Sequence, residues 1–294
     1  MNFKEWYRSK SVELFSGYIE PYIHYFEDLK PDLIRADINL SLREYLSIAL
    51  MTIVIVFSIE MPLIAFIVGM MPEFTIPMAV FFSLTVSLGV AGLIAFLFYI
   101  NPSLKAGSRA EEIEHGVPFA ATYLATISGS GIHPSEMFKI LAEFESYEEI
   151  AEEAKKISTR VELFGMNITE ALSRSAKGSP SERLSDLLWG MITTIRSGTD
   201  LYDYLQDKSR ELMREYERDL EEYSESLGTF LQIYLTLIIV GSIFTVIVTS
   251  IMSAFGLGAE MAGMITVIQF SVVFIFLPVI TLGFVWLLQT TYPG

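Results

Sequence analysis

Four long apolar stretches constrain this chain more than any other feature of its sequence. They cover about residues 45–71, 75–100, 230–255 and 264–289, and none of them contains Lys or Arg. Each is at least as long as the ~20 residues that a helix needs to cross the ~30 Å hydrocarbon core of a bilayer. Because a soluble core does not require such runs, we expect a polytopic membrane protein with four transmembrane helices.

The Lys and Arg residues are confined to two parts of the chain. Six of the 20 precede Glu44, and the other fourteen lie between Lys105 and Arg218. Since Lys and Arg are retained on the cytoplasmic side, we expect a protein of the cytoplasmic (inner) membrane with both termini in the cytoplasm. The expected divisions are an N-terminal amphipathic cytoplasmic segment (1–44), a transmembrane hairpin (45–100), a cytoplasmic domain (101–228) and a second transmembrane hairpin (229–294).

The cytoplasmic domain has helical spacing throughout. Its apolar residues recur at intervals of three and four, and turn residues cluster at 128–134 and 197–199. Gly129, Gly131 and Gly198 are the expected turn glycines. Two helical hairpins joined by an acidic helix would form an all-α bundle, with helices at 118–128, 135–144, 147–164, 170–176, 181–196 and 200–226.

Polar residues with short side chains mark two helix starts in this domain. Asn167 or Thr169 can cap the helix that follows, and Thr199 or Asp200 can cap the last one. The last helix has no breaker before Gly228, so we expect it to continue into the third apolar stretch.

The N-terminal segment also has helical spacing. Aromatic and aliphatic residues recur at three and four from Phe3 to Ile23, with Lys and Arg between them. This pattern is typical of a helix that lies at the membrane interface. Packing of the same face on the cytoplasmic domain is the alternative, and the sequence does not separate the two.

The chain is acidic, with a net charge of −15, and residues 101–228 contain 24 acidic and 14 basic residues. Such a domain is not drawn flat onto an anionic leaflet and does not bind nucleic acid. The acidic residues form either a solvated helical surface or a docking face for a basic partner protein. The residues expected at such a face are Glu111, Glu112, Glu114, Asp200, Asp203 and Asp207.

Catalytic and cofactor motifs are absent from the sequence. With no Cys there is no disulfide or thiolate site, and the three His residues, His24, His115 and His133, have no metal-binding spacing. The glycines at 128–131 are followed by no Gly-Lys-Ser/Thr, so no phosphate loop is predicted. We expect no metal, no cofactor and no enzymatic activity.

Two polar residues fall within the apolar stretches, Glu60 in the first and Gln269 in the fourth. Ionisable groups inside a membrane are often functional. The first span could instead end near Ser58, with Glu60 at the outer headgroups. A transporter or channel subunit with Glu60 and Gln269 on its path is therefore the alternative class of function.

Three segments of the cytoplasmic domain resemble a known family. Residues 117–141 (VPFAATYLATISGSGIHPSEMFKIL) resemble the first hairpin of the type II secretion F domain, and residues 164–172 and 187–205 resemble its later part. The layout of the spans is similar to the TadB/TadC branch and to half of the archaellum J protein. The resemblance covers roughly residues 35–290, with one such domain where secretion and archaellum platforms usually have two.

The resemblance implies an integral-membrane platform protein of a type IV pilus-like or archaellum-like machine. Such a protein couples a cytoplasmic hexameric ATPase to the insertion or extraction of pilin-like subunits, and has no catalytic task. A single F domain implies a homodimer or a paralogous sister subunit.

Overall fold

The computed structural model describes residues 3–72, 75–143, 147–254 and 277–291, with five further positions at 267, 270, 271, 274 and 275. Within these ranges the regular structure is entirely helical, as the sequence predicts. The chain forms two compact units, Met1–Ser209 and Arg210–Gly294. We call them unit 1 and unit 2.

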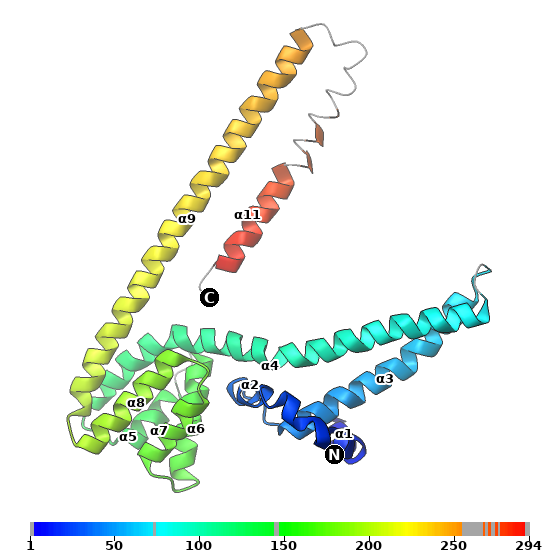
Figure 1. Cartoon of the computed structure of the whole chain (residues 1–294). Coiled ribbons are helices and arrows are strands. Elements are labelled where there is room, and N and C mark those ends of the chain that lie inside the picture. Colours follow the sequence, from blue (N-terminus) through cyan, green and yellow to red (C-terminus); the bar gives the residue numbers. More distant parts are fainter. Residues whose placement is uncertain are drawn as a thin grey trace. The chain divides into compact units, whose positions relative to one another are not determined.

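Unit 1 contains eight complete α-helices, one 3₁₀ helix and the first turns of α9 (Figure 1). The elements in chain order are α1 (Phe3–Ile19), η1 (Glu20–Phe26), α2 (Leu29–Arg35), α3 (Leu42–Gly69), α4 (Ile76–Ser128), α5 (Pro134–Leu141), α6 (Glu148–Glu162), α7 (Ile168–Gly178), α8 (Glu182–Ser197) and α9 (Leu201–Ala254).

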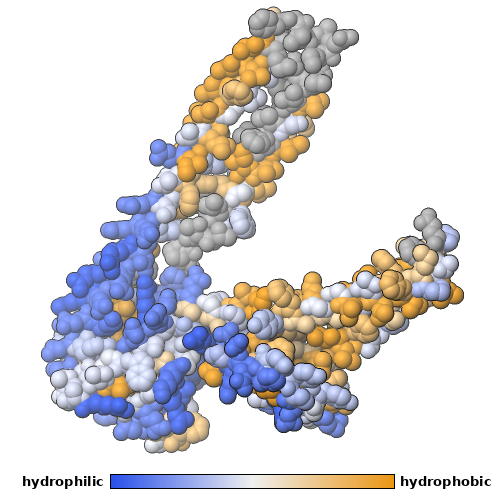
Figure 2. All heavy atoms as spheres, viewed as in Figure 1, coloured by the Kyte–Doolittle hydropathy of each residue, from blue (hydrophilic) through white to orange (hydrophobic). Residues whose placement is uncertain are grey.

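Three of these helices are long and apolar enough to cross a membrane, namely Leu42–Gly69, Ile76–Ser128 and Leu201–Ile251. The chain is therefore a membrane protein. Figure 2 shows apolar surface along α3 and the first half of α4, and mostly hydrophilic surface over α5 to α8. The fourth expected span, 264–289, lies partly outside the described residues.

The helices α3 and α4 form a hairpin. Tyr45 donates a hydrogen bond from its hydroxyl to the Phe98 carbonyl over 2.8 Å at one end, and Gly69 lies against Ala79 at the other. Ser41 caps α3: its hydroxyl accepts from the Glu44 backbone, and the Glu44 carboxylate accepts from the Ser41 backbone. This capping box satisfies donors that the first helical turn otherwise leaves unpaired.

The helix α4 is one element of 53 residues, with Pro102 and Pro118 inside it. The helix start expected at Pro118 is therefore wrong, and residue 101, the expected domain boundary, lies within a helix. Proline removes one backbone hydrogen bond and usually kinks a helix or ends it. Here the turn around Pro118 is buried on the domain side, with Gly116, Val117 and Ala120, so packing holds the helix together across the proline.

We call residues 106–209 the helical domain. Its core contains the second half of α4 and the helices α5 to α8, with fully buried side chains that include Ile113, Leu124, Phe138, Leu172, Leu187 and Met191. The expected caps are present, because Asn167 accepts from the Thr169 amide and Asp200 accepts from the Tyr202 amide.

The three turn positions require glycine for different reasons. Gly131 follows α4 with φ +72°, and Gly198 follows α8 with φ +69°. Residues other than glycine rarely adopt this left-handed conformation. Gly129 has φ −61°, and a Cβ there would lie 3.2 Å from the Tyr202 ring, so its small size matters rather than its backbone freedom.

Two further glycines allow close helix crossings. A Cβ on Gly116 of α4 would lie 2.6 Å from Ile150 of α6, and a Cβ on Gly190 of α8 would lie 1.8 Å from the Tyr204 hydroxyl. That hydroxyl donates to the Leu187 carbonyl over 3.1 Å. Neither crossing was predicted from the sequence.

The N-terminal segment contacts both the α3–α4 hairpin and the helical domain of unit 1. The helix α1 packs on α3, with Tyr7 hydrogen-bonded to Thr52 over 2.9 Å and Arg8 paired with Glu44. The helix α2 packs on α4 and reaches α7. The expected packing on the helical domain is therefore confirmed for α2, whereas a place for α1 at the membrane interface stays a prediction.

Unit 2 contains the remainder of α9 and α11 (Leu277–Thr291). Tyr234 of α9 hydrogen-bonds to Thr281 of α11 over 3.2 Å, and its ring stacks on Phe284 with centroids 4.4 Å apart. The helix α9 runs without a break from Leu201 to Ala254, which confirms the expected continuation into the third apolar stretch.

Candidate functional site at the junction of α2, α4 and α6

A buried arginine marks the place where three elements of unit 1 meet. Arg109 lies on α4, and its side chain is only 5% exposed. Nε donates to the Glu149 carboxylate over 2.5 Å, and Nη2 donates to Glu153 over 2.8 Å. Nη1 donates to the Arg35 carbonyl over 3.0 Å. One guanidinium thus joins α4 to α6 and to the end of α2.

A second cation extends this cluster. Lys156 of α6 pairs with Glu153 over 3.1 Å and with Asp37 over 2.9 Å. Asp37 follows the C-cap of α2 and has φ +53°, a left-handed conformation that Asp tolerates better than most residues. We call Asp37, Arg109, Glu149, Glu153 and Lys156 the junction cluster.

The end of α2 needs such a partner. The last carbonyls of a helix receive no hydrogen bond from within the helix. The Arg35 carbonyl accepts one from Arg109 instead of from water. Ala36 beside it is fully buried. A cation near a helix C-terminus also interacts favourably with the helix dipole. The position of Arg109 at the C-terminus of α2 therefore favours this docking.

Burial changes the acidity of the cluster. The pKa of Glu149 is raised above its ordinary value because burial disfavours the carboxylate and outweighs the attraction of Arg109; Glu152 and Glu112 raise it further. Burial alone would lower the pKa of Arg109, but the hydrogen bond and charge of Glu153, with Glu149 and Asp37, raise it. Arg109 therefore stays charged.

The junction cluster holds helices together and offers no catalytic chemistry of its own. It contains no nucleophile beside a base, and within the described ranges no three His, Asp or Glu side chains are placed to hold a metal ion. The sequence contained one usable signal, since Glu149, Glu153 and Lys156 share one face of α6 at spacings of three and four. Their partner Arg109, 40 residues away, could not be identified in that way.

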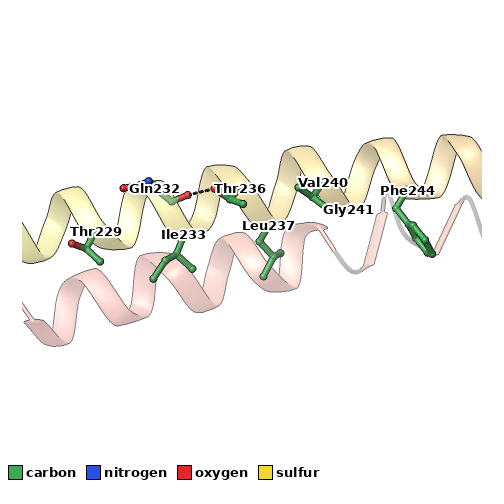
Figure 3. Close-up of a pocket in the computed structure, with 8 residues that line it drawn as sticks. All are labelled: Thr229, Gln232, Ile233, Thr236, Leu237, Val240, Gly241 and Phe244. Atoms are coloured by element: carbon green, nitrogen blue, oxygen red, sulfur yellow. Dashed lines mark hydrogen bonds between the residues drawn. The ribbon is translucent and has the colours of Figure 1, made fainter.

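A groove runs along one face of α9 in unit 2. Eight residues line a cavity of about 670 Å³ at spacings of three and four, as Figure 3 shows: Thr229, Gln232, Ile233, Thr236, Leu237, Val240, Gly241 and Phe244. Four of them, Thr229, Gln232, Thr236 and Gly241, are small or polar residues, which are typical of membrane helix–helix contacts.

Glu60 lies well inside α3 rather than at its end. The helix continues through Pro62 to Gly69, so α3 itself does not end near Ser58, and an intramembrane position of Glu60 stays a prediction. One carboxylate oxygen of Glu60 and the hydroxyl of Ser87 are buried without a hydrogen-bond partner among the described residues. Glu60 lies nine residues before Gly69 and Ser87 eight after Ala79, so the α3–α4 hairpin places them at the same level. Gln269 lies outside the described residues.

Comparison with known proteins identifies a family model that part of the chain matches. Residues 120–249 match the model of the family described as type II secretion system (T2SS), protein F. We call this matched region the F domain.

Relatives of the chain include archaeal proteins. An uncharacterized protein of Methanocaldococcus jannaschii is 23% identical over 142 residues, 48% of this chain and 24% of that protein. Flagella accessory protein J of Methanococcus voltae is 25% identical over 170 residues, 58% of this chain and 30% of that protein. Flagella accessory protein J of Methanocaldococcus jannaschii is 24% identical over 136 residues, 46% of this chain and 24% of that protein. The chain thus matches less than a third of the length of each relative, and no solved structure matches it.

The F domain begins inside α4 and ends inside α9, so the junction arginine lies just outside it. Of the acidic residues predicted to contact a partner, Asp200, Asp203 and Asp207 lie in the F domain and are exposed. Glu111 and Glu112 are also exposed, and Glu114 is half-buried.

These acidic residues form two groups. Asp200 lies near the end of α4, since Tyr202 contacts Gly129, whereas Glu114 is fifteen residues earlier on α4, roughly 22 Å along the axis. Glu111, Glu112 and Glu114 lie inside the helix α4, away from its ends. Whether either group contacts a partner stays a prediction.

Two exposed apolar residues of the F domain were missed by the sequence analysis. Leu163 is 77% exposed and Phe164 is 69% exposed, at the end of α6. Gly165 follows with φ +63° and turns the chain into α7. Adjacent large apolar residues before a glycine at a helix end are the signal that could have identified them.

Proposed function

We propose that this protein is the integral-membrane platform of a type IV pilus-like or archaellum-like assembly machine. The observation that carries the proposal is that one continuous helix connects an apolar stretch to the F domain without a loop. The helix α4 begins in the apolar stretch at Ile76 and ends at Ser128 within the F domain. Two of the relatives carry the name flagella accessory protein J.

This arrangement suits a protein that passes movement from the cytoplasm to the membrane. A hexameric secretion ATPase is the proposed cytoplasmic partner, and a displacement of the helical domain would reach the bilayer through α4. The junction cluster supports this role because Arg109 ties α4 to α2 and α6. With charge-assisted hydrogen bonds, the three elements would move together.

The α9 groove suits a partner within the membrane. Its small and polar residues, Thr229, Gln232, Thr236 and Gly241, allow close approach of another helix. The proposed occupants are a pilin-like subunit or α9 of a second copy or sister subunit. The arrangement of Lys and Arg supports placement in the cytoplasmic membrane with both termini in the cytoplasm.

The proposal is tested with the full chain in lipid nanodiscs and a hexameric secretion ATPase from the same organism. Binding and the rate of ATP hydrolysis are measured with and without the nanodiscs at several salt concentrations. We expect specific binding and a change in turnover. Absence of both at low salt would remove the platform function.

Two sets of variants locate the contact. Charge reversal at Asp200, Asp203 and Asp207 tests an electrostatic contact, which weakens with salt. Leu163→Ala with Phe164→Ala tests an apolar contact, which weakens little. The control exchanges the exposed ion pair of α7, Glu170→Lys with Arg174→Glu, and should bind like the parent protein.

A second function, as a subunit of a transporter, is favoured by one observation: a carboxylate oxygen of Glu60, within the first apolar stretch, is buried without a hydrogen-bond partner among the described residues. Ion flux in proteoliposomes that disappears in Glu60→Gln would support it. If ATPase binding is present and flux is absent, the platform function stands.

A further inference from the structure

An apolar groove lies between the N-terminal segment and the ends of the two helices of the α3–α4 hairpin. It has a volume of about 430 Å³, and its lining comes from α1, η1, α2, α3 and α4. We call it the interfacial groove.

The floor of the groove is apolar and its polar groups are satisfied. Ile19, Leu29 and Ala49 are buried. Tyr45 is also buried, but its hydroxyl donates to the Phe98 carbonyl and its ring packs edge-on against the Phe98 ring. A ligand in the groove would therefore meet hydrocarbon and aromatic rings, and needs no polar group of its own.

The rim of the groove has the composition of a membrane interface. Tyr18 is 74% exposed, Tyr22 is 60% exposed, and Tyr99 is also exposed. Tyrosine is enriched at the level of the lipid headgroups, where one end of the ring is apolar and the other is hydrated. The rings therefore place the mouth of the groove at the boundary between hydrocarbon and water.

The position of the groove along α3 and α4 agrees with that boundary. The lining residues of α3 lie in its first three turns, directly after Arg43, and those of α4 lie just before its charged section begins at Lys105. From this level the apolar surfaces of α3 and α4 continue toward Gly69 and Ile76. The groove thus opens onto the same surface that faces the lipid chains.

The size of the groove discriminates among possible occupants. A helix is about 10 Å wide and rises 5.4 Å per turn, so about one turn would fill this volume. A helix of a partner protein therefore does not fit, whereas a single extended hydrocarbon chain does. Ligand pockets commonly have volumes of ~300–1,000 Å³.

We propose that the interfacial groove binds the hydrocarbon chain of one bilayer lipid, which then fills the space between α1, η1 and the α3–α4 hairpin. The atoms that line an empty groove lack dispersion contacts on one side, so a long chain that fills it stabilises the docking of the N-terminal segment. The ion pairs near the groove, Arg8 with Glu44 and Arg43 with Glu20, are each neutral overall. The groove thus recognises the chain and not a charged headgroup.

The test uses native mass spectrometry of the full chain, purified in mild detergent from its membrane. We expect one lipid mass per protein that survives washing. Ala95→Trp places an indole in the groove from an exposed position on its wall, and should reduce the lipid-bound fraction about tenfold or more. Ala65→Trp, the same substitution on α3 outside the groove, should keep the lipid.

A second measurement does not depend on filling the groove. Leu46→Trp, on the groove wall, and Leu63→Trp, on the exposed face of α3, are compared in detergent micelles that contain a few phospholipids with brominated chains. Bromine quenches nearby indole fluorescence, and the native Trp6, Trp189 and Trp286 give the same background in both variants. We expect quenching of Leu46→Trp at lipid-to-protein ratios at least tenfold lower than for Leu63→Trp.

Three results would overturn the proposal. They are retention of lipid in Ala95→Trp at the parental level, equal quenching of the two Trp variants, and an adduct with the mass of the detergent that added lipid does not displace. A mass equal to a second protein chain, lost in Ala95→Trp, would assign the groove to a protein contact instead.

Discussion

Arg109 donates to Glu153 over 2.8 Å, and both side chains are less than a tenth exposed. Taking two charges out of water is unfavourable, and their attraction compensates only if further hydrogen bonds satisfy the remaining groups. Here Glu149 and the Arg35 carbonyl occupy the other guanidinium nitrogens, and Lys156 binds the same oxygen of Glu153. The cluster is therefore sensitive to the loss of any one buried member.

The two glutamates of the cluster should differ in what their removal does. Glu153→Gln removes the carboxylate shared by Arg109 and Lys156, and breaking a buried pair in this way typically destabilises by about 3–5 kcal/mol. Glu149 is 24% exposed, and burial already disfavours its charge, so Glu149→Gln should destabilise far less. Thermal unfolding in detergent measures both. Equal losses would show that the two carboxylates are equivalent.

The raised pKa of Glu149 predicts a pH dependence with a definite sign. The folded protein holds this proton up to a higher pH than the unfolded chain, whose carboxyl has the ordinary pKa of 4.5. As the pH rises from 4.5 through the folded pKa, the contribution of Glu149 to the free energy of unfolding therefore falls. Unfolding temperatures are measured from pH 4 to 7. The unfolding temperature of Glu149→Gln, relative to that of the parent protein, should increase as the pH rises. A constant or shrinking difference would contradict this.

The class and most of the helices of this protein could be predicted from the sequence because they depend on local signals. Apolar length gave the membrane helices, and Asn167, Asp200 and Gly198 marked helix ends by capping and backbone preference. The predicted helix start at Pro118 was wrong. Proline disfavours the interior of a helix locally, whereas the burial that holds α4 together around it is a tertiary effect.

The junction cluster could not be predicted, because it joins residues far apart in the chain. Arg109 and Arg35 are 74 positions apart, and Arg109 and Glu153 are 44 apart. With one sequence, nothing indicates which cation meets which carboxylate. Gly190 was missed for the same reason, since only the folded structure places the Tyr204 hydroxyl beside it.

Gly190→Ala should destabilise the helical domain, because a Cβ would overlap the Tyr204 hydroxyl, which is already held by the Leu187 carbonyl. Overpacking of this kind typically costs about 1–3 kcal/mol. Gly107→Ala is the matched control, since nothing lies within 4 Å of its Cβ. Glycine inside a helix is disfavoured relative to alanine by ~1 kcal/mol, so that variant should unfold at a higher temperature than the parent.

Glu60→Leu should raise the unfolding temperature of the protein. A buried carboxylate oxygen without a partner is unfavourable, and leucine removes it. Ser58→Leu, two residues away on the exposed part of α3, is the control for added apolar surface. Thermal unfolding in detergent measures both variants. A lower unfolding temperature for Glu60→Leu would show that the carboxylate has a partner that stabilises the fold.

The α9 groove predicts a pattern of cross-links that can be read without background, because the chain contains no Cys. Thr236→Cys lies on the groove, and Leu235→Cys, next to it, lies on a different, exposed face of α9. If a second copy occupies the groove, Thr236→Cys should form a disulfide-linked dimer in membranes. The helix contact is then the same surface on both copies, and Leu235→Cys should cross-link far less.

A filament subunit in the groove gives a different result in the same membranes. With one Cys in the apolar helix of a pilin-like subunit, Thr236→Cys should yield a product of mixed mass and little dimer. Gly241→Ile, which narrows the groove near its Phe244 end, should reduce whichever product forms, because close approach of two helices requires small residues at the crossing. Cross-linking of Thr236→Cys and Leu235→Cys to the same extent would mean that the groove faces only lipid.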